Sequence, residues 1–168
     1  LGACGQSDSG GAAGTKAGET IKIALIPAAT GPYAQFGQDS SNGWRLAAEE
    51  ANAAGGVAGM KVEIVEKSSD GTPATTIRAA REAATKDGAQ YLGGIISSTE
   101  HGALNPQLAD LGMLSISVAR DDSLTAENCT ANHFRVAASN SMVATSLAQS
   151  MGDFAGDKWA ILAVDFST

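Results

Sequence analysis

The chain has 168 residues, of which 43% are hydrophobic and 17% charged, and a formal net charge of −7 at pH 7. Lysine and arginine occur singly along the sequence, so the basic stripe that nucleic-acid binding requires is absent and that function is excluded. No apolar run approaches the ~20 residues of a membrane-spanning helix. The acidic residues have no metal-ligand spacing, and the two cysteines have no zinc spacing. The sequence therefore predicts no metal and no cofactor.

The first 20 residues differ in composition from the rest. The opening Leu-Gly-Ala-Cys resembles the end of a bacterial lipoprotein signal, in which Cys4 becomes the lipidated N-terminus after cleavage. The glycine-rich polar residues after it predict a flexible tether, so residues 1–20 are interpreted as lipobox and tether. A cloning scar or an ordinary disordered end is the alternative. If Cys4 is lipidated, Cys129 is either a buried free thiol or bonded to a cysteine outside this sequence.

The first folded unit is predicted to be strand, loop, helix and strand. Ile21–Ile26 is almost entirely apolar, as in a strand buried on both faces. Thr30-Gly31-Pro32 then supplies turn residues, and helical periodicity follows through Trp44. Gly55-Gly56 ends that helix, and the second strand begins at Lys61.

Strands and helices continue to alternate along the chain. Thr72-Pro73 predicts a helix start, and Gly88, Gly112 and Gly156 predict three helix ends, the last for a helix that begins after Ser139 or Ser141. This alternation favours an α/β fold with a doubly wound parallel sheet. The further strands are predicted at Lys61–Glu66, Tyr91–Ile96, Met113–Val118 and Lys158–Val164, with a short one inside Asn128–Ala137.

Two motifs of the first unit carry a family resemblance. Thr30–Gly37 reads T-G-P-Y-A-Q-F-G, and Glu50–Gly56 reads E-A-N-A-A-G-G. Both resemble the type I periplasmic binding proteins, which are solute-binding proteins of ABC transporters for branched-chain amino acids and related small molecules. The resemblance implies a first lobe over residues 21–135, a crossover at Phe134-Arg135 and the start of a second lobe over residues 136–168. The rest of that lobe would lie beyond this sequence.

A ligand in an open parallel sheet lies at the carboxyl ends of the strands. After the predicted strand at Tyr91, Ser97, Ser98 and Thr99 place three hydroxyls before a helix, an arrangement that suits a carboxylate. Alternatively, these residues only cap the helix. The family resemblance implies that Ser97, four residues after Gly93, contacts the ligand carboxylate.

The resemblance implies further contacts in the turn after the next strand, at Val118, Ala119 and Arg120. The Val118 carbonyl is placed to accept a hydrogen bond from a ligand ammonium. Amino-acid binders of the family tend to have threonine where Arg120 stands. The ligand is therefore either a branched-chain amino acid or an aromatic or dicarboxylic acid, to whose carboxylate an arginine can make two parallel hydrogen bonds. Alternatively, Arg120 is a solvated side chain paired with Asp121 or Asp122.

Aromatic residues of the first loop are candidates for a cleft wall. Tyr33 and Phe36 lie in the loop motif, and local packing over the loop is the alternative interpretation. Trp44 is predicted to be a core residue. Asp70 is predicted to be a loop acid or helix cap rather than part of the cleft.

No catalytic function is predicted. The sequence around Ser97 lacks the G-x-S-x-G elbow of a hydrolase, and His101 and His133 are interpreted as surface histidines. Dinucleotide and phosphate-loop motifs are absent from the sequence. The prediction is an extracytoplasmic, lipid-anchored solute-binding protein that delivers a small amino acid or organic acid to an ABC permease. A ligand-sensing receptor domain of the same fold and a hydrolase built on Ser97 and His101 are the rivals.

Overall fold

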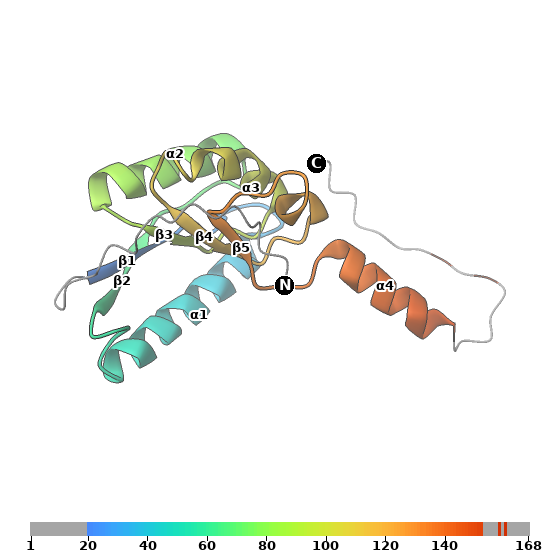
Figure 1. Cartoon of the computed structure of the whole chain (residues 1–168), viewed down its shortest axis with the longest axis horizontal. Helices are drawn as coiled ribbons and strands as arrows, with labels where there is room; N and C mark the ends of the chain where they lie inside the picture. The colour runs from blue at the N-terminus through green and yellow to red at the C-terminus, as the bar shows by residue number, and fades with distance from the viewer. Residues whose placement is uncertain (1–19, 153–157, 159, 161–168) are drawn as a thin grey trace.

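The computed structural model describes residues 20–152 together with Lys158 and Ala160. Its centre is a five-stranded sheet in the order β2-β1-β3-β4-β5, and every neighbouring pair of strands is parallel. Helix α1 lies on one face of this sheet, and α2 and α3 lie on the other (Figure 1). The predicted doubly wound α/β fold is confirmed. The strands are β1 Thr20–Leu25, β2 Lys61–Glu66, β3 Tyr91–Gly93, β4 Leu114–Ser117 and β5 His133–Arg135.

The helices follow the strands as predicted, with shorter segments between them. Helix α2 passes directly into a π-helical turn, and α3 passes into a 3-10 turn. The helical segments are α1 Ala34–Ala53, α2 Pro73–Glu82, η1 Ala83–Asp87, α3 Ser98–Leu104, η2 Asn105–Gln107, η3 Asp122–Thr125 and α4 Asn140–Met151.

The end of α1 shows why the E-A-N-A-A-G-G motif has its residues. Gly56 adopts a φ of 85°, and a Cβ there would lie 2.2 Å from the carbonyl oxygen of Met60, so only glycine fits. The Asn52 side chain donates to the Val62 carbonyl and accepts from the Val62 amide, both at 2.8 Å. The motif therefore turns the chain and fixes the helix end to β2.

Several predicted boundaries differ from the structure. The helix predicted to run to Gly112 ends at Leu104, because Pro106 lacks the amide that a continuing helix needs. Phe36 is part of α1 and not of the first loop. Thr72 precedes α2 without capping it, since its hydroxyl donates to Asp70. The helix predicted to end at Gly156 ends at Met151, with Gly152 at its C-cap position. The tether and the strand expected at residues 158–164 lie outside the continuous described segment.

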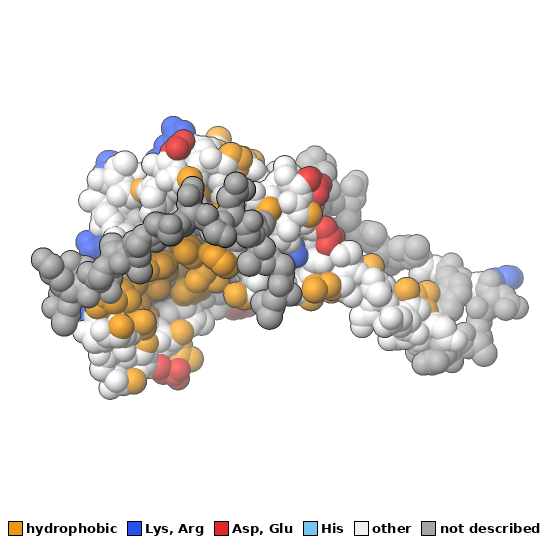
Figure 2. All heavy atoms as spheres, in the orientation of Figure 1, with side chains coloured by type: hydrophobic (Ala, Val, Ile, Leu, Met, Phe, Trp, Pro, Cys, Tyr) orange, Lys and Arg blue, Asp and Glu red, His pale blue; other side chains and the backbone are white. Residues whose placement is uncertain are grey.

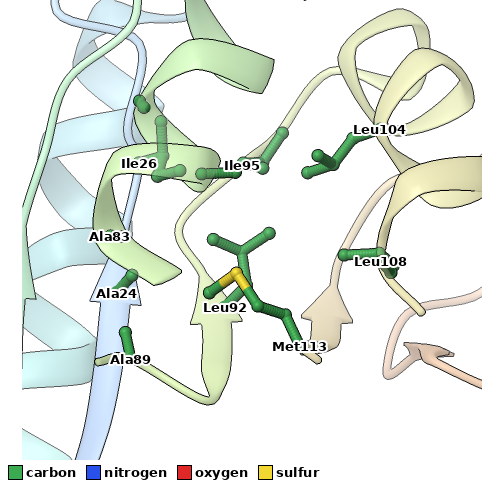
Figure 3. Close-up of a cluster of buried hydrophobic side chains, with 11 residues drawn as sticks. Ala24, Ile26, Ala83, Ala89, Leu92, Ile95, Leu104, Leu108 and Met113 are labelled. Carbon is green, nitrogen blue, oxygen red and sulfur yellow. The ribbon is translucent and has the colours of Figure 1, made fainter. Parts of the chain in front are cut away.

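The hydrophobic core lies between the sheet and the helices α2 and α3 (Figure 3). Helix α2 and η1 contribute mainly alanines, which let the helix approach the strands closely. On the opposite face, the Trp44 ring of α1 packs against Gly93, where a Cβ would lie 2.6 Å from it. Trp44, predicted to be a core residue, is thus half-buried against the sheet and lies outside the hydrophobic core cluster. The core residues labelled in Figure 3 are Ala24, Ile26, Ala83, Ala89, Leu92, Ile95, Leu104, Leu108 and Met113.

The α1 side of the sheet is only partly covered. Figure 2 shows apolar side chains gathered there beside α1. Phe134 and Val136 are exposed, and they alternate along the chain with Arg135, which bonds to Thr125. Helix α4 buries none of its described residues, so the apolar face predicted from Val143 and Leu147 is exposed.

Candidate functional site

The loops that follow β1, β2, β3 and β4 form one connected border, called here the carboxyl edge. Ala28 and Ser69 join the first two loops through a parallel bridge, with the Ala29 amide 2.9 Å from the Ser69 carbonyl. The Ser69 hydroxyl donates to Glu100 Oε1 at 2.8 Å and so joins the second loop to α3. The Ser98 hydroxyl accepts from the Arg120 and Asp121 amides at 3.2 and 3.1 Å. The four predicted strand ends therefore lie side by side.

Ser97 is the N-cap of α3. Its extended backbone (φ −75°, ψ 131°) precedes the helix, and its buried hydroxyl accepts from the Glu100 amide at 3.5 Å. The structure therefore contains the helix cap at Ser97 that the alternative interpretation of the sequence predicted. A cap uses only a lone pair of the hydroxyl, so the Ser97 hydrogen stays available for a second acceptor.

The two residues after Ser97 have different environments. Ser98 is half-buried and holds the turn at Arg120 and Asp121, as described above. Thr99 is exposed on the first turn of α3. Of the predicted hydroxyl trio, Ser97 and Ser98 thus shape the carboxyl edge, and Thr99 presents its side chain outward.

The turn after β4 alternates between exposed and buried residues. Val118 and Arg120 are exposed and Ala119 is buried between them. The Arg120 carbonyl accepts from the Asn140 amide at 2.9 Å, which connects this turn to the start of α4. Within the described residues Arg120 makes no ion pair. Asp121 accepts from the Ser123 amide, and Asp122 accepts from Ser141. The predicted pairing with Asp121 or Asp122 is therefore not present there.

The candidate cleft-wall residues lie at the start of α1. Tyr33 is the N-cap position and is half-buried, and Phe36 is 61% exposed on the first turn. Asp70 accepts from the Thr72 amide and from the Thr72 and Thr75 hydroxyls. The Thr72 hydroxyl, followed by that of Thr75, lowers the pKa of Asp70 to about 2. Asp70 is therefore the loop acid that the sequence predicted.

The interpretation of the two histidines as surface residues is wrong. His101 of α3 and His133 of β5 are both buried, with ring centroids 4.9 Å apart and planes at 64°. The Ser117 hydroxyl lies 3.4 Å from His133 Nε2. Neither His101 ring nitrogen has a hydrogen-bond partner among the described residues, and no bond between His101 and Ser97 side chains is present there. The geometry gives no support to a hydrolase built on that pair.

Burial dominates the protonation of both imidazoles. It lowers the pKa of His101 to about 3, with His133 adding repulsion, and this exceeds the opposing effect of the nearby Ile95 carbonyl and Asn105 side chain. Burial and then the charge of Arg135 also lower the pKa of His133. Both rings are therefore neutral at pH 7.

Sequence reasoning did not find the contacts that join the loops. One such contact joins Glu100 of α3 to Thr76 of α2, whose hydroxyl donates to the carboxylate. No local pattern marks such a contact, because the partners are 24 residues apart. The sequence did contain one indication of a buried polar cluster around the histidines. Leu114–Ser117 reads L-S-I-S, which places two serines on the same face of a strand.

The described part of the chain contains neither a group of three metal-binding side chains nor a helix long and apolar enough to cross a bilayer. Cys129 is disulfide-bonded, so the prediction that it is a buried free thiol is wrong.

Comparison with known proteins agrees with this architecture. The family described as periplasmic binding protein matches residues 20–168. The Leu/Ile/Val-binding protein of Escherichia coli K12 is 30% identical over 118 residues, which are 70% of this chain and 31% of that protein. The branched-chain amino acid transporter substrate binding protein LivJ of Streptococcus pneumoniae, solved with isoleucine, has a TM-score of 0.67 and 27% identity, over 73% of this chain and 35% of that one.

A solute binding protein of an ABC transporter from R. palustris, solved with 4-hydroxybenzoate, has a TM-score of 0.66 and 27% identity, over 80% of this chain and 37% of that one. Fold, strand order and family match therefore agree with the resemblance in the first loop. The chain belongs to the periplasmic binding protein family. It spans about a third of the length of the curated relatives it matches.

Proposed function

We propose that the full-length protein is an extracytoplasmic solute-binding protein that captures a small carboxylate and presents it to an ABC permease. The observation that carries the proposal is the carboxyl edge, where Ser97, Ser98 and the turn at Arg120 are joined at the strand ends. Such an edge is where open α/β sheets bind their ligands. We propose no enzymatic activity, since the relatives named above are binding proteins.

The ligand class follows from the side chains of that edge. Ser97 and Thr99 offer hydroxyl donors, and Arg120 offers a fork of N–H groups without an ion pair in the described part of the chain. Isoleucine and 4-hydroxybenzoate, bound by the two solved relatives, both carry a carboxylate. Arg120 favours an aromatic or second acidic group on the ligand, whereas the Val118 carbonyl suits an ammonium. Tyr33 and Phe36, at the start of α1, are proposed to wall the cleft.

The division into lobes remains part of the proposal. Residues 21–135 would form the first lobe, and residues 136–168 would begin the second, with α4 as its first helix. Asp122 links the two, because it accepts from the Ser141 amide at 3.0 Å and from the Ser141 hydroxyl at 2.5 Å. Ligand would be captured by hinge closure of the lobes.

Lipid anchoring at Cys4 is proposed from the Leu-Gly-Ala-Cys sequence and the polar tract after it. It also favours transport over a ligand-sensing receptor domain, the second candidate function. Acylation uses the Cys4 sulfur, so in the lipidated protein Cys4 could not form a disulfide with Cys129, the other cysteine of this chain. Mass spectrometry of the membrane-extracted protein should find acyl mass on Cys4, and an unmodified Cys4 in that material contradicts the anchor.

Titration calorimetry on the full-length protein tests the ligand site. Charge-assisted hydrogen bonds contribute about 1.5–3 kcal/mol, so Ser97→Ala should weaken binding of the acid roughly tenfold to a hundredfold. Because Ser97 also caps α3, this variant is expected to lose about 0.5–2 kcal/mol of stability, and affinity is measured where it is fully folded. Thr85→Ala, at the far end of α2 and η1, is the control and should bind normally.

Arg120→Ala separates the ligand classes in the same titration. A large loss of affinity indicates an aromatic acid or a second acidic group, and no loss indicates an aliphatic amino acid. Unchanged affinity in both Ser97→Ala and Arg120→Ala would show that the site lies elsewhere.

A further inference from the structure

Glu100 is a buried carboxylate at the carboxyl edge. It is 1% exposed and makes no ion pair within the described residues. A buried carboxylate is tolerated only where hydrogen bonds replace its lost hydration. Here the donors are two hydroxyls, from Ser69 after β2 and from Thr76 in α2, and both reach Oε1. A second copy of this arrangement is not found elsewhere in the described chain.

The contacts of Glu100 extend to three loops. Its amide donates to Ser97, the N-cap of α3. The Ser69 hydroxyl that it holds also accepts from the Gly71 amide at 3.2 Å, and the Ser69 backbone pairs with Pro27 and Ala29 of the first loop. The Glu100 carboxylate thus joins α3, which follows the β3 loop, to α2 and to the loop after β2, and the Ser69 backbone extends this connection to the loop after β1.

We propose that Glu100 is a positioning residue for ligand binding: its carboxylate fixes the relative positions of the first three loops of the carboxyl edge. The proposal rests on the binding function proposed above and adds a residue that does not contact the ligand. Fixed loops raise affinity because less conformational freedom is lost when the ligand binds. A side chain buried beneath the loops is suited to that role.

The test compares Glu100→Ala with Glu100→Gln in the full-length protein, using L-isoleucine and 4-hydroxybenzoate as probes. The glutamine keeps an Oε1 acceptor for both hydroxyls, so its affinity should stay within about threefold of wild type, whereas the alanine variant should bind about tenfold or more weakly. Leu108→Ala is the control for stability, because it removes a core side chain away from the loops. It should lower the melting temperature and leave affinity unchanged.

Hydrogen exchange of the unliganded protein gives a readout that needs no ligand. The amides of Ala29, Ser69 and Gly71 should exchange about tenfold or more faster in Glu100→Ala than in Glu100→Gln or Leu108→Ala. If wild type binds neither probe, the proposed function is in doubt and exchange alone decides the role of Glu100. A Glu100→Ala variant with unchanged exchange at these amides, or with lowered stability but wild-type affinity, would overturn the proposal.

Discussion

Glu100 and His101 are neighbours on α3, are equally buried at 1% exposure, and have opposite hydrogen-bond environments. Glu100 accepts from Ser69 and Thr76, and these three residues are called here the Glu100 cluster. His101 belongs to a histidine cluster under the other side of α3, in which several buried polar atoms have no partner among the described residues. That cluster consists of His101, Asn105, Ser115, Ser117 and His133.

The difference shows that burial alone does not define the energetic role of a polar side chain. Hydrogen bonds to a buried charged group stabilise the fold by about 1.5–3 kcal/mol each, whereas a buried polar atom without a partner costs about 1–3 kcal/mol. One side of α3 is therefore expected to stabilise the carboxyl edge. The other side is expected to make the domain sensitive to acid.

The largest expected effect is acid destabilisation through the histidine cluster. The pKa of His101 is about 3 in the folded protein and about 6.5 in the unfolded chain, so between these values the unfolded state binds one more proton. Its contribution is fully present above pH 6.5 and is lost as the pH falls towards 3, at up to about 1.4 kcal/mol per pH unit. The upper limit over this range is about 5 kcal/mol from His101. His133, whose pKa is also lowered, acts in the same direction.

Urea unfolding between pH 7.5 and 4.5 measures this slope. In the 168-residue chain, Trp44 fluorescence reports on this domain once Trp159 is replaced by phenylalanine. His101→Leu should flatten the slope between pH 6.5 and 4.5 without lowering stability at pH 7.5 by the same amount. An unchanged slope in His101→Leu would show that this imidazole binds the same number of protons in the folded and unfolded states, so that burial does not lower its pKa.

The next effect is expected on the other side of α3. Thr76→Val removes one hydroxyl donor from the buried carboxylate at nearly constant volume, and should destabilise the domain by about 1.5–3 kcal/mol. Thr75→Val is the matched control, since its hydroxyl donates to the exposed Asp70, and a change of about 0.5 kcal/mol is expected. Equal losses at the two positions would mean that the Glu100 cluster stabilises no more than a surface contact.

A smaller effect of opposite sign is expected at Ser115. Its hydroxyl is fully buried and has no partner within the described chain, so Ser115→Ala removes an unsatisfied group. Stability at pH 7 should rise by up to about 1 kcal/mol or stay the same. A loss above about 1 kcal/mol would indicate that an internal water satisfies this hydroxyl. Urea midpoints at pH 7.5 distinguish the two results.

The strands, the helices and the carboxyl edge were predictable because they depend on local patterns. Apolar runs and turn residues predicted the strands of a parallel sheet, and Gly55-Gly56 predicted the end of α1 correctly. Pro106 is the local signal that ends α3 before the predicted Gly112.

The two sides of α3 were not predictable in the same way. Whether His101 faces solvent depends on where β4 and β5 lie under α3, which is decided by tertiary packing. The Glu100 bonds join residues 24 and 31 positions apart and follow from the parallel sheet only after its helices are placed. A lone histidine on the first turn of a helix has the same sequence pattern whether it is exposed or buried.

The smallest expected effect lies at Asp70, a residue whose pKa is low although its side chain is exposed. Its pKa is about 2, like a strongly stabilised acid, yet the side chain is exposed and its partners are the nearby Thr72 and Thr75 hydroxyls. Because the folded pKa is below the unfolded value of about 3.9, its contribution is present above pH 4 and is lost as the pH falls towards 2. Solvent screening makes that contribution small. Asp70→Asn should therefore leave the urea midpoint almost unchanged between pH 7.5 and 4.5, where His101→Leu changes the slope. If Asp70→Asn flattened the slope in that range instead, the acid sensitivity would belong to the exposed loop and not to the buried side of α3.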